Sequence, residues 1–164
     1  MNNEEFSLEI AYFSSPLGSI EIRSERGMIT GLYFLDEKKE EIVPEMLREA
    51  VRQLKLYFLG VLTIFDLPVY LKGTDFQKSV WGKLMEIPYG STTSYGEIAA
   101  KLGLKNGARA VGLANGSNPV SIIIPCHRVI GHSGKLTGYN GGLWRKQWLL
   151  KLEQPEMNTG LFEK

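Results

Sequence analysis

The 164-residue chain contains a single cysteine, Cys126, and only two histidines. One cysteine cannot form an intramolecular disulfide, and it excludes a structural zinc site built on several cysteines. No window approaches the roughly 18 consecutive apolar residues of a membrane-spanning helix. The first five residues include two glutamates and no apolar run, so we expect no signal peptide there. Together these absences favour a cytoplasmic protein with no membrane partner, in a reducing location where a free thiol survives.

The net charge of +1 hides an asymmetry between the two halves of the chain. Residues 1–72 carry 8 Lys and Arg against 12 Asp and Glu, whereas residues 73–164 carry 11 against 6. We expect two domains, 1–72 and 73–164, because the pattern changes near Leu71-Lys72-Gly73 from that of a sheet to that of helices. The basic excess of the second domain suits a polyanionic partner such as a nucleic acid.

The N-terminal half has the pattern of a small sheet followed by a helix. Leu8, Ile10 and Tyr12 recur at every second position, and so do Ile20 and Ile22, which is the spacing of a β-strand. Turn clusters at 14–18 and 26–27 separate these runs from 28–34, which predicts a three-stranded antiparallel meander. After Pro44 the apolar residues follow a helical spacing up to Gly60 (Leu47, Ala50, Val51, Leu54, Tyr57 and Phe58). Residues 64–69 are a candidate for one more short strand.

The C-terminal half is predicted to be mostly helical, so the chain as a whole belongs to the α+β class. Two capping boxes, Thr74…Gln77 and Ser94…Glu97, each predict the start of a helix. The first of these helices has an apolar face at helical spacing (Phe76, Val80, Trp81, Leu84 and Met85). A further helix is expected from about 107 to 114, and a last one from 143 to 153.

The two short helices near 95–102 and 107–114 fit a helix-turn-helix, whose second helix can enter a DNA groove. An ordinary corner between two packed helices explains the same pattern. Small residues leave the second helix nearly bare, and Arg109 is its one long cation. A bare helix suits close approach to DNA, but it equally suits packing on the domain core.

Cys126 stands directly beside His127, after Pro125 and the apolar run 121–124. Such a run predicts a short buried strand that Pro125 ends. A free thiol titrates near ~8.5, and an imidazole partner lowers that value toward the nucleophilic thiolate. This chemistry needs a third group that holds the imidazole, so we expect a distant carboxylate. A lone cysteine is also commonly a small, buried apolar residue, so a purely structural role for Cys126 is the alternative to a nucleophilic one.

The segment from Asn118-Pro119 to Pro125-Cys126-His127-Arg128-Val129-Ile130 closely resembles the active-site signature of O6-alkylguanine-DNA alkyltransferases. The resemblance covers most of residues 74–153. It includes Ser94-Tyr95-Gly96-Glu97, Ala108-Arg109-Ala110-Val111-Gly112, Gly138-Tyr139-Asn140-Gly141-Gly142 and Trp148-Leu149-Leu150 up to Glu153. It implies an RNase H-like N-terminal domain and a C-terminal domain with a helix-turn-helix and the active-site cysteine.

The resemblance implies a DNA repair protein that is consumed by its own reaction. Cys126 would take the alkyl group from O6 of guanine in double-stranded DNA and keep it, with O4 of thymine as a further candidate substrate. His127 would act through a water as base, Glu153 would orient His127, and Asn118 would tie the helix-turn-helix to the cysteine segment. Tyr95 would donate toward guanine N3.

The remaining residues carried over by the resemblance lie on the DNA and substrate side. Because the alkylated atom is inside the stacked duplex, the nucleotide must flip out. Arg109 would then fill the vacated place, Tyr139 would form a wall of the pocket, and the backbone N–H of Asn140 would face the guanine oxygen. Further contacts with substrate or DNA are expected from Thr93, Ser94, Ala108, Gly112 and Val129.

The N-terminal half has no Cys or His, so the zinc site of some relatives is not expected, and no cofactor is implied. Asn140 stands where some relatives have a smaller residue, so the resemblance implies a pocket that is narrower toward bulky alkyl groups. We expect a monomer in the absence of DNA. Two other functions compete with alkyl transfer: a damage-sensing binding protein in which Cys126 is incidental, and a cysteine hydrolase that turns over.

Overall fold

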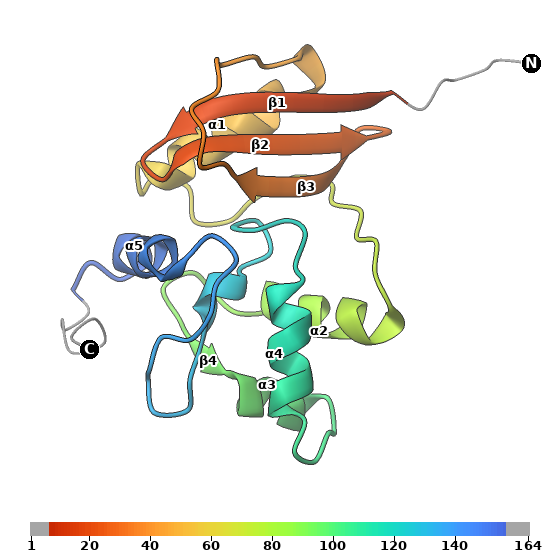
Figure 1. Cartoon of the computed structure of the whole chain (residues 1–164), viewed down its shortest axis with the longest axis vertical. Coiled ribbons are helices and arrows are strands. Elements are labelled where there is room, and N and C mark those ends of the chain that lie inside the picture. The colour runs from red at the N-terminus through yellow and green to blue at the C-terminus, as the bar shows by residue number, and fades with distance from the viewer. Residues whose placement is uncertain (1–6, 157–164) are drawn as a thin grey trace, which may run out of the picture. The chain divides into compact units, whose positions relative to one another are not determined.

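The computed structural model describes residues 7–156, and the chain divides into two compact units, residues 1–71 and 72–164 (Figure 1). The expectation that residues 1–5 hold no signal peptide lies outside the described residues.

The first unit is a three-stranded antiparallel sheet with a helix against one face (Figure 1). The strands β1 (Leu8–Ser15), β2 (Gly18–Glu25) and β3 (Met28–Phe34) lie in the order β1-β2-β3. Arg26 and Gly27 link β2 to β3 with positive φ values of 52° and 76°, the backbone that a tight two-residue hairpin requires. The predicted meander is thus confirmed.

The helix α1 (Arg48–Phe58) follows a single 3₁₀ turn, η1 (Glu45–Leu47), directly after Pro44. All six residues of its predicted apolar face are buried, so the helical spacing identified the core side correctly. The alternation at Leu8, Ile10 and Tyr12 does not mark the buried face of β1. The structure buries Ala11 and Phe13, opposite Ile22 and Ile20 of β2, whereas Leu8, Ile10 and Tyr12 lie on the other, less buried face.

The short strand expected at residues 64–69 does not form. Val69 makes only an isolated bridge with Ile29, and Ile64 is exposed. The short apolar run at 64–69, between the end of a helix and the domain boundary, therefore does not predict a paired strand.

The second unit consists of four helices, a 3₁₀ turn and one pair of very short strands within the described residues. The helices are α2 (Asp75–Met85), α3 (Tyr95–Lys101), α4 (Ala108–Gly116) and α5 (Leu143–Glu153). The strands β4 (Thr93–Ser94) and β5 (Val129–Ile130) pair in parallel, Thr93 with Val129 and Ser94 with Ile130. This pair holds the start of α3 beside the segment that follows the cysteine.

Both predicted capping boxes are present. The side chains of Thr74 and Ser94 accept hydrogen bonds from the backbone N–H groups of Gln77 and Glu97, whose side chains bond back. In α2, Trp81 is buried and its Nε1–H donates to the Ala114 carbonyl of α4 at 2.8 Å. A buried indole needs such a partner, and this bond ties α2 to α4. Phe76 and Met85, predicted on the buried face of α2, are instead exposed.

The helices α3 and α4 contact each other as the predicted helix pair, and residues 102–107 connect them. Gly103 and Asn106 supply the positive φ values, 72° and 54°, that this tight turn requires. Val111 and Ala114 of α4 are buried, whereas Arg109 and Leu113 are exposed. One side of α4 therefore packs on the unit, and the other side presents an arginine and a leucine to solvent.

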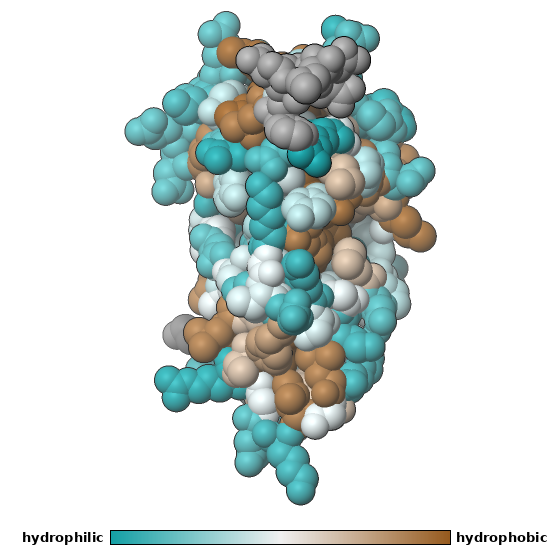
Figure 2. All heavy atoms as spheres, turned by 90° about the vertical axis from the view of Figure 1, so that its right-hand side faces the viewer, coloured by the Kyte–Doolittle hydropathy of each residue, from teal (hydrophilic) through white to brown (hydrophobic). Residues whose placement is uncertain are grey.

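On the face in Figure 2, hydrophilic and apolar side chains lie side by side. Exposed apolar residues occur in both units, for example Ile64 and Leu113. Among residues 7–156, no helix is long and apolar enough to cross a membrane.

Candidate functional site

Cys126 opens a 3₁₀ turn, η2 (Cys126–Arg128), and its side chain is 4% exposed. Three residues of the preceding run, Ser121, Ile122 and Ile124, are buried, but the run is not a strand, which corrects the prediction. It turns back on itself through an isolated bridge between Ser121 and Ile124, and Ile122 has a positive φ of 71°. An apolar run indicated burial correctly, but it could not indicate a turn.

Asn118 holds this turn in place. Its Nδ2–H donates to the Ile124 carbonyl at 2.8 Å, and its Oδ1 accepts from the Val120 backbone N–H at 3.0 Å. Burial raises the pKa of the Cys126 thiol, while hydrogen bonding by Asn118 and the nearby charge of Lys146 act in the opposite direction. The resting site therefore favours the neutral thiol and needs a base to ionise it.

His127 lies completely buried next to the cysteine, and its Nε2 is 2.6 Å from Oε2 of Glu153. Burial lowers the pKa of His127, against the opposing effect of the Glu153 carboxylate, so the imidazole is neutral at neutral pH. A neutral ring that donates from Nε2 leaves a lone pair on Nδ1. That Nδ1 is buried and has no hydrogen-bond partner among the described residues. The free lone pair is the proton acceptor that a thiol requires.

Arg128, to which the sequence analysis gave no role, shares the carboxylate with His127. Its Nε donates to Glu153 Oε1 at 2.7 Å and its Nη2 to Oε2 at 3.2 Å, while Nη1 donates to the Ile87 carbonyl at 2.7 Å. Burial would raise the pKa of Glu153, but the hydrogen bond from His127 and the hydrogen bonds and charge of Arg128 outweigh it and hold the pKa far below its usual range. Glu153 therefore stays ionised and accepts hydrogen bonds from both the His127 ring and the Arg128 guanidinium.

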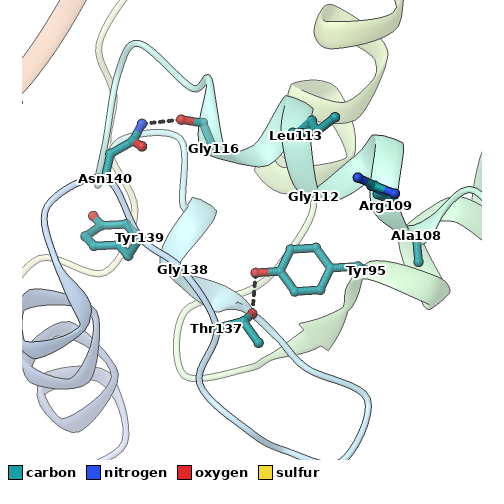
Figure 3. A pocket seen from close by; sticks show the side chains of 10 residues that line it. All are labelled: Tyr95, Ala108, Arg109, Gly112, Leu113, Gly116, Thr137, Gly138, Tyr139 and Asn140. Carbon is teal, nitrogen blue, oxygen red and sulfur yellow. Dashed lines mark hydrogen bonds between the residues drawn. The ribbon is translucent and has the colours of Figure 1, made fainter.

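A cavity of about 470 Å³ lies between α4 and the loop before α5 (Figure 3). Its lining includes six residues predicted from the sequence and four others: Tyr95, Ala108, Arg109, Gly112, Leu113, Gly116, Thr137, Gly138, Tyr139 and Asn140. Two hydrogen bonds cross it (Figure 3). Tyr95 Oη lies 2.8 Å from Thr137 Oγ1, and Asn140 Nδ2 donates to the Gly116 carbonyl at the end of α4.

The structure separates the predicted site residues into two groups. Cys126, His127, Glu153 and Asn118 form the buried cluster, and none of them is among the residues that line the cavity. Tyr95, Arg109, Tyr139 and Asn140, with Ala108 and Gly112, form the cavity. Tyr139 links the two groups, because its ring lines the cavity while its hydroxyl is buried.

Thr93, Ser94 and Val129, predicted as substrate or DNA contacts, lie in the β4–β5 pair instead of the cavity. Val129 is buried, Ser94 is the cap of α3, and the Thr93 hydroxyl lies 2.5 Å from Glu97 Oε2. In this structure these residues position α3, which carries Tyr95.

Lys146 and Asn115 are buried polar residues that sequence reasoning missed. Lys146 is completely buried on α5 and donates from Nζ to the Thr137 carbonyl at 2.9 Å. Asn115 of α4 is also buried, with Nδ2 at 3.5 Å from the Cys126 carbonyl. Their proximity to the cysteine results from tertiary packing, and no local pattern marks it. Among residues 7–156 there is no group of three or more His, Cys, Asp or Glu that could hold a metal ion.

Two family models cover most of the chain. Residues 75–155 match the model described as 6-O-methylguanine DNA methyltransferase, DNA binding domain, and residues 8–71 match that of its ribonuclease-like domain. The methylated-DNA–protein-cysteine methyltransferase of Methanosarcina acetivorans is 51% identical over 150 residues, which are 87% of this chain and 96% of the relative. The protein of the same name from Mycobacterium bovis is 51% identical over 146 residues, 85% and 88% of the two chains.

Solved structures give the same result for the fold. The O6-methylguanine methyltransferase of Mycobacterium tuberculosis superposes with a TM-score of 0.83 at 47% identity, over 96% of this chain and 100% of that one. A structure of the Mycobacterium tuberculosis OGT in complex with DNA superposes with a TM-score of 0.82 at 48% identity, over 93% and 98%. The fold, the buried Cys-His-Glu cluster and these similarities lead to one conclusion: this chain belongs to the 6-O-methylguanine DNA methyltransferase family.

Proposed function

We propose that this protein repairs DNA by moving an alkyl group from O6 of guanine onto Cys126 in a single, irreversible turnover. The observation that carries the proposal is the buried cluster in which Glu153 holds His127 at 2.6 Å and leaves His127 Nδ1 without a partner. A methyl group is the simplest substrate, and O4 of alkylthymine is a further candidate.

The chemistry follows from the protonation states of this cluster. His127 Nδ1 accepts the thiol proton through a water, since no direct hydrogen bond joins the ring to the sulfur among the described residues. The thiolate sulfur then forms a bond with the alkyl carbon as the bond from that carbon to guanine O6 breaks. The electron pair of the broken bond stays on guanine, which takes up the proton and remains in the DNA as an ordinary base.

The product explains the single turnover. The thioether on Cys126 is chemically inert, and the chain has no second cysteine that could remove the alkyl group. Charge develops on the departing guanine, so hydrogen-bond donors placed at that base lower the barrier most. We assign this role to the Tyr95 hydroxyl at N3 and to the Asn140 backbone N–H at O6.

Double-stranded DNA containing O6-alkylguanine is the proposed partner. The helix α4 presents Arg109 and Leu113 beside small residues, so backbone can approach a groove and Arg109 can enter the space of a flipped nucleotide. Extrusion costs a few kcal/mol, and less for a damaged, poorly paired base. The basic excess of residues 73–164 helps less than the composition implies, because Arg128, Arg145 and Lys146 are buried.

Entry of the base requires the loop that carries residues 137–140 to move. In this structure Cys126 is buried and is not among the residues that line the cavity, and the Tyr95 hydroxyl, which we assign to guanine, is hydrogen-bonded to Thr137. A flipped guanine must therefore replace Thr137 as the partner of Tyr95.

We assign DNA binding and alkyl transfer to residues 73–164 and a supporting role to residues 1–72. The reaction involves one chain and one lesion, so we propose a monomer that acts in the reducing cytoplasm, where the thiol stays free.

The test is a titration of a duplex containing one O6-methylguanine with increasing protein. The expected result is repair that reaches a limit of one lesion per protein molecule, with none by the Cys126→Ala variant, which still binds the duplex. Repair of many lesions per protein would instead identify a turnover enzyme, and repair by the Cys126→Ala variant would remove Cys126 from the mechanism.

A further inference from the structure

Lys146 is a charged side chain in the interior of the second unit to which the mechanism above gives no role. It is 0% exposed, and it lies on α5 seven residues before Glu153, so two helical turns place both side chains on the same side of the helix. Its Nζ donates to the Thr137 carbonyl at 2.9 Å, and within residues 7–156 no salt bridge joins it to a carboxylate.

A buried ammonium without an anion is strongly unfavourable, so its presence calls for a negative charge nearby. Glu153 does not supply that charge, because Arg128 binds it through two nitrogens and His127 binds it through Nε2. Cys126 is the remaining group in the cluster that can become an anion. With the thiol protonated, the cluster of Cys126, His127, Arg128, Lys146 and Glu153 carries a net positive charge, and with the thiolate it is neutral.

The charges of Lys146 and Cys126 shift each other's pKa in the directions that favour the pairing of an ammonium with a thiolate. Burial lowers the pKa of Lys146 to about 8, and the charge of Cys126 opposes that shift. In turn, the charge of Lys146 lowers the pKa of Cys126 and contributes to lowering that of His127. Tyr139, whose hydroxyl is also buried, has a raised pKa because of burial and the charge of Cys126, so it stays neutral. Lys146 therefore favours the reactive combination, a thiolate beside a neutral imidazole.

We propose that Lys146 is a positioning residue whose buried ammonium, anchored on the Thr137 carbonyl, is the counter-ion of the Cys126 thiolate. The need for a thiolate rests on the proposed function, whereas the experiment below does not depend on it. His127 takes the thiol proton and passes it on, whereas Lys146 supplies the lasting positive charge. Because Thr137 also bonds to Tyr95, movement of the loop on substrate entry alters the anchor of this counter-ion at the same moment.

The test measures the pH dependence of Cys126 alkylation by iodoacetamide, which involves neither DNA nor alkylguanine. Lys146→Met removes the charge and keeps an unbranched side chain, Lys146→Arg keeps the charge, and Lys151→Met changes an exposed lysine on the same helix. For Lys146→Met we expect the midpoint to rise by about one pH unit, hence a roughly tenfold slower reaction near neutral pH, with the plateau rate at high pH unchanged. Lys146→Arg and Lys151→Met should keep the wild-type midpoint.

An unchanged midpoint in folded Lys146→Met would overturn the proposal. If that variant does not fold, the wild-type protein still decides the question through the NMR titration of the Lys146 ammonium before and after iodoacetamide treatment. Loss of the thiolate should lower the pKa of Lys146, and equal values in the two forms would refute the pairing. If the midpoint shifts as expected in Lys146→Met but the wild-type protein leaves methylated DNA unrepaired, the pairing stands and only the proposed function is rejected.

Discussion

Replacement of Glu153 by glutamine is the perturbation with the largest predicted effect on both folding and chemistry. The carboxylate accepts hydrogen bonds from His127 and twice from Arg128, and its side chain is almost fully buried. Glutamine keeps the shape and removes the charge. Arg128 is then left as a buried cation without an anion, and such a change costs about 3–5 kcal/mol of folding stability.

For a chain of this length, each kcal/mol corresponds to roughly 2–4 °C in Tm, so Glu153→Gln should unfold about 6–20 °C below the wild type. His127→Gln is the matched comparison, since it leaves the pairing of Glu153 with Arg128 intact. It should lose alkyl transfer equally, but it should lose only about 1–2 kcal/mol. Glu156→Gln, at an exposed carboxylate three residues further on, should change neither quantity.

The pH dependence of folding stability tests the same charge pairing independently. The folded-state pKa of Glu153 is depressed, so the stability it contributes is fully present above the unfolded value of about 4.3 and is lost as the pH falls below it. Thermal unfolding between pH 3 and 7 should therefore show a smaller acid-induced loss in Glu153→Gln than in the wild type. A variant that is stable to within about 1 kcal/mol of the wild type, with unchanged acid sensitivity, would refute the charge pairing.

Three further predictions concern the cavity and the sulfur. Arg109→Ala should slow repair of duplex DNA much more than reaction with free O6-benzylguanine, because only a duplex has a gap to fill, and equal losses measured on both substrates would contradict that role. Thr137→Val removes the partner of Tyr95 at 2.8 Å and should speed the reaction with free O6-benzylguanine by a few-fold, and a slower reaction would contradict a closing bond. Methylation of Cys126 removes the anion that pairs with Lys146 once the thiol has ionised, so above the midpoint of thiol ionisation the methylated protein should unfold at lower temperature than the free protein in calorimetry, with a smaller difference in Lys146→Met. Equal differences would contradict the pairing.

Local signals predicted the helices well. The capping boxes at Thr74 and Ser94 depend on residues three positions apart, so they can be read from the chain itself, and both are present. The face of α1 was also correct, because an amphipathic helix has only one apolar side. The strand predicted at 121–124 is wrong. A run of β-branched residues indicates burial, but Ile122 adopts a turn conformation that its residue type disfavours, and the run itself does not predict this.

The candidate site was predictable only where its residues are neighbours in sequence. Cys126 and His127 are adjacent in the sequence, so both could be named as candidates without knowledge of the fold. Glu153 came from the family resemblance. Arg128 and Lys146 were missed because charged residues are normally expected at the surface, and only the packing of α5 on the cysteine turn buries them.

The central claim is that Cys126 itself becomes the permanent acceptor of the alkyl group, and intact mass followed by peptide mapping tests it most directly. After incubation with excess duplex containing O6-methylguanine, every protein molecule should gain the mass of one CH2 group, located on the peptide that contains Cys126. A protein mass that stays the same while the DNA is repaired, or a methyl group found on another residue, would contradict the account.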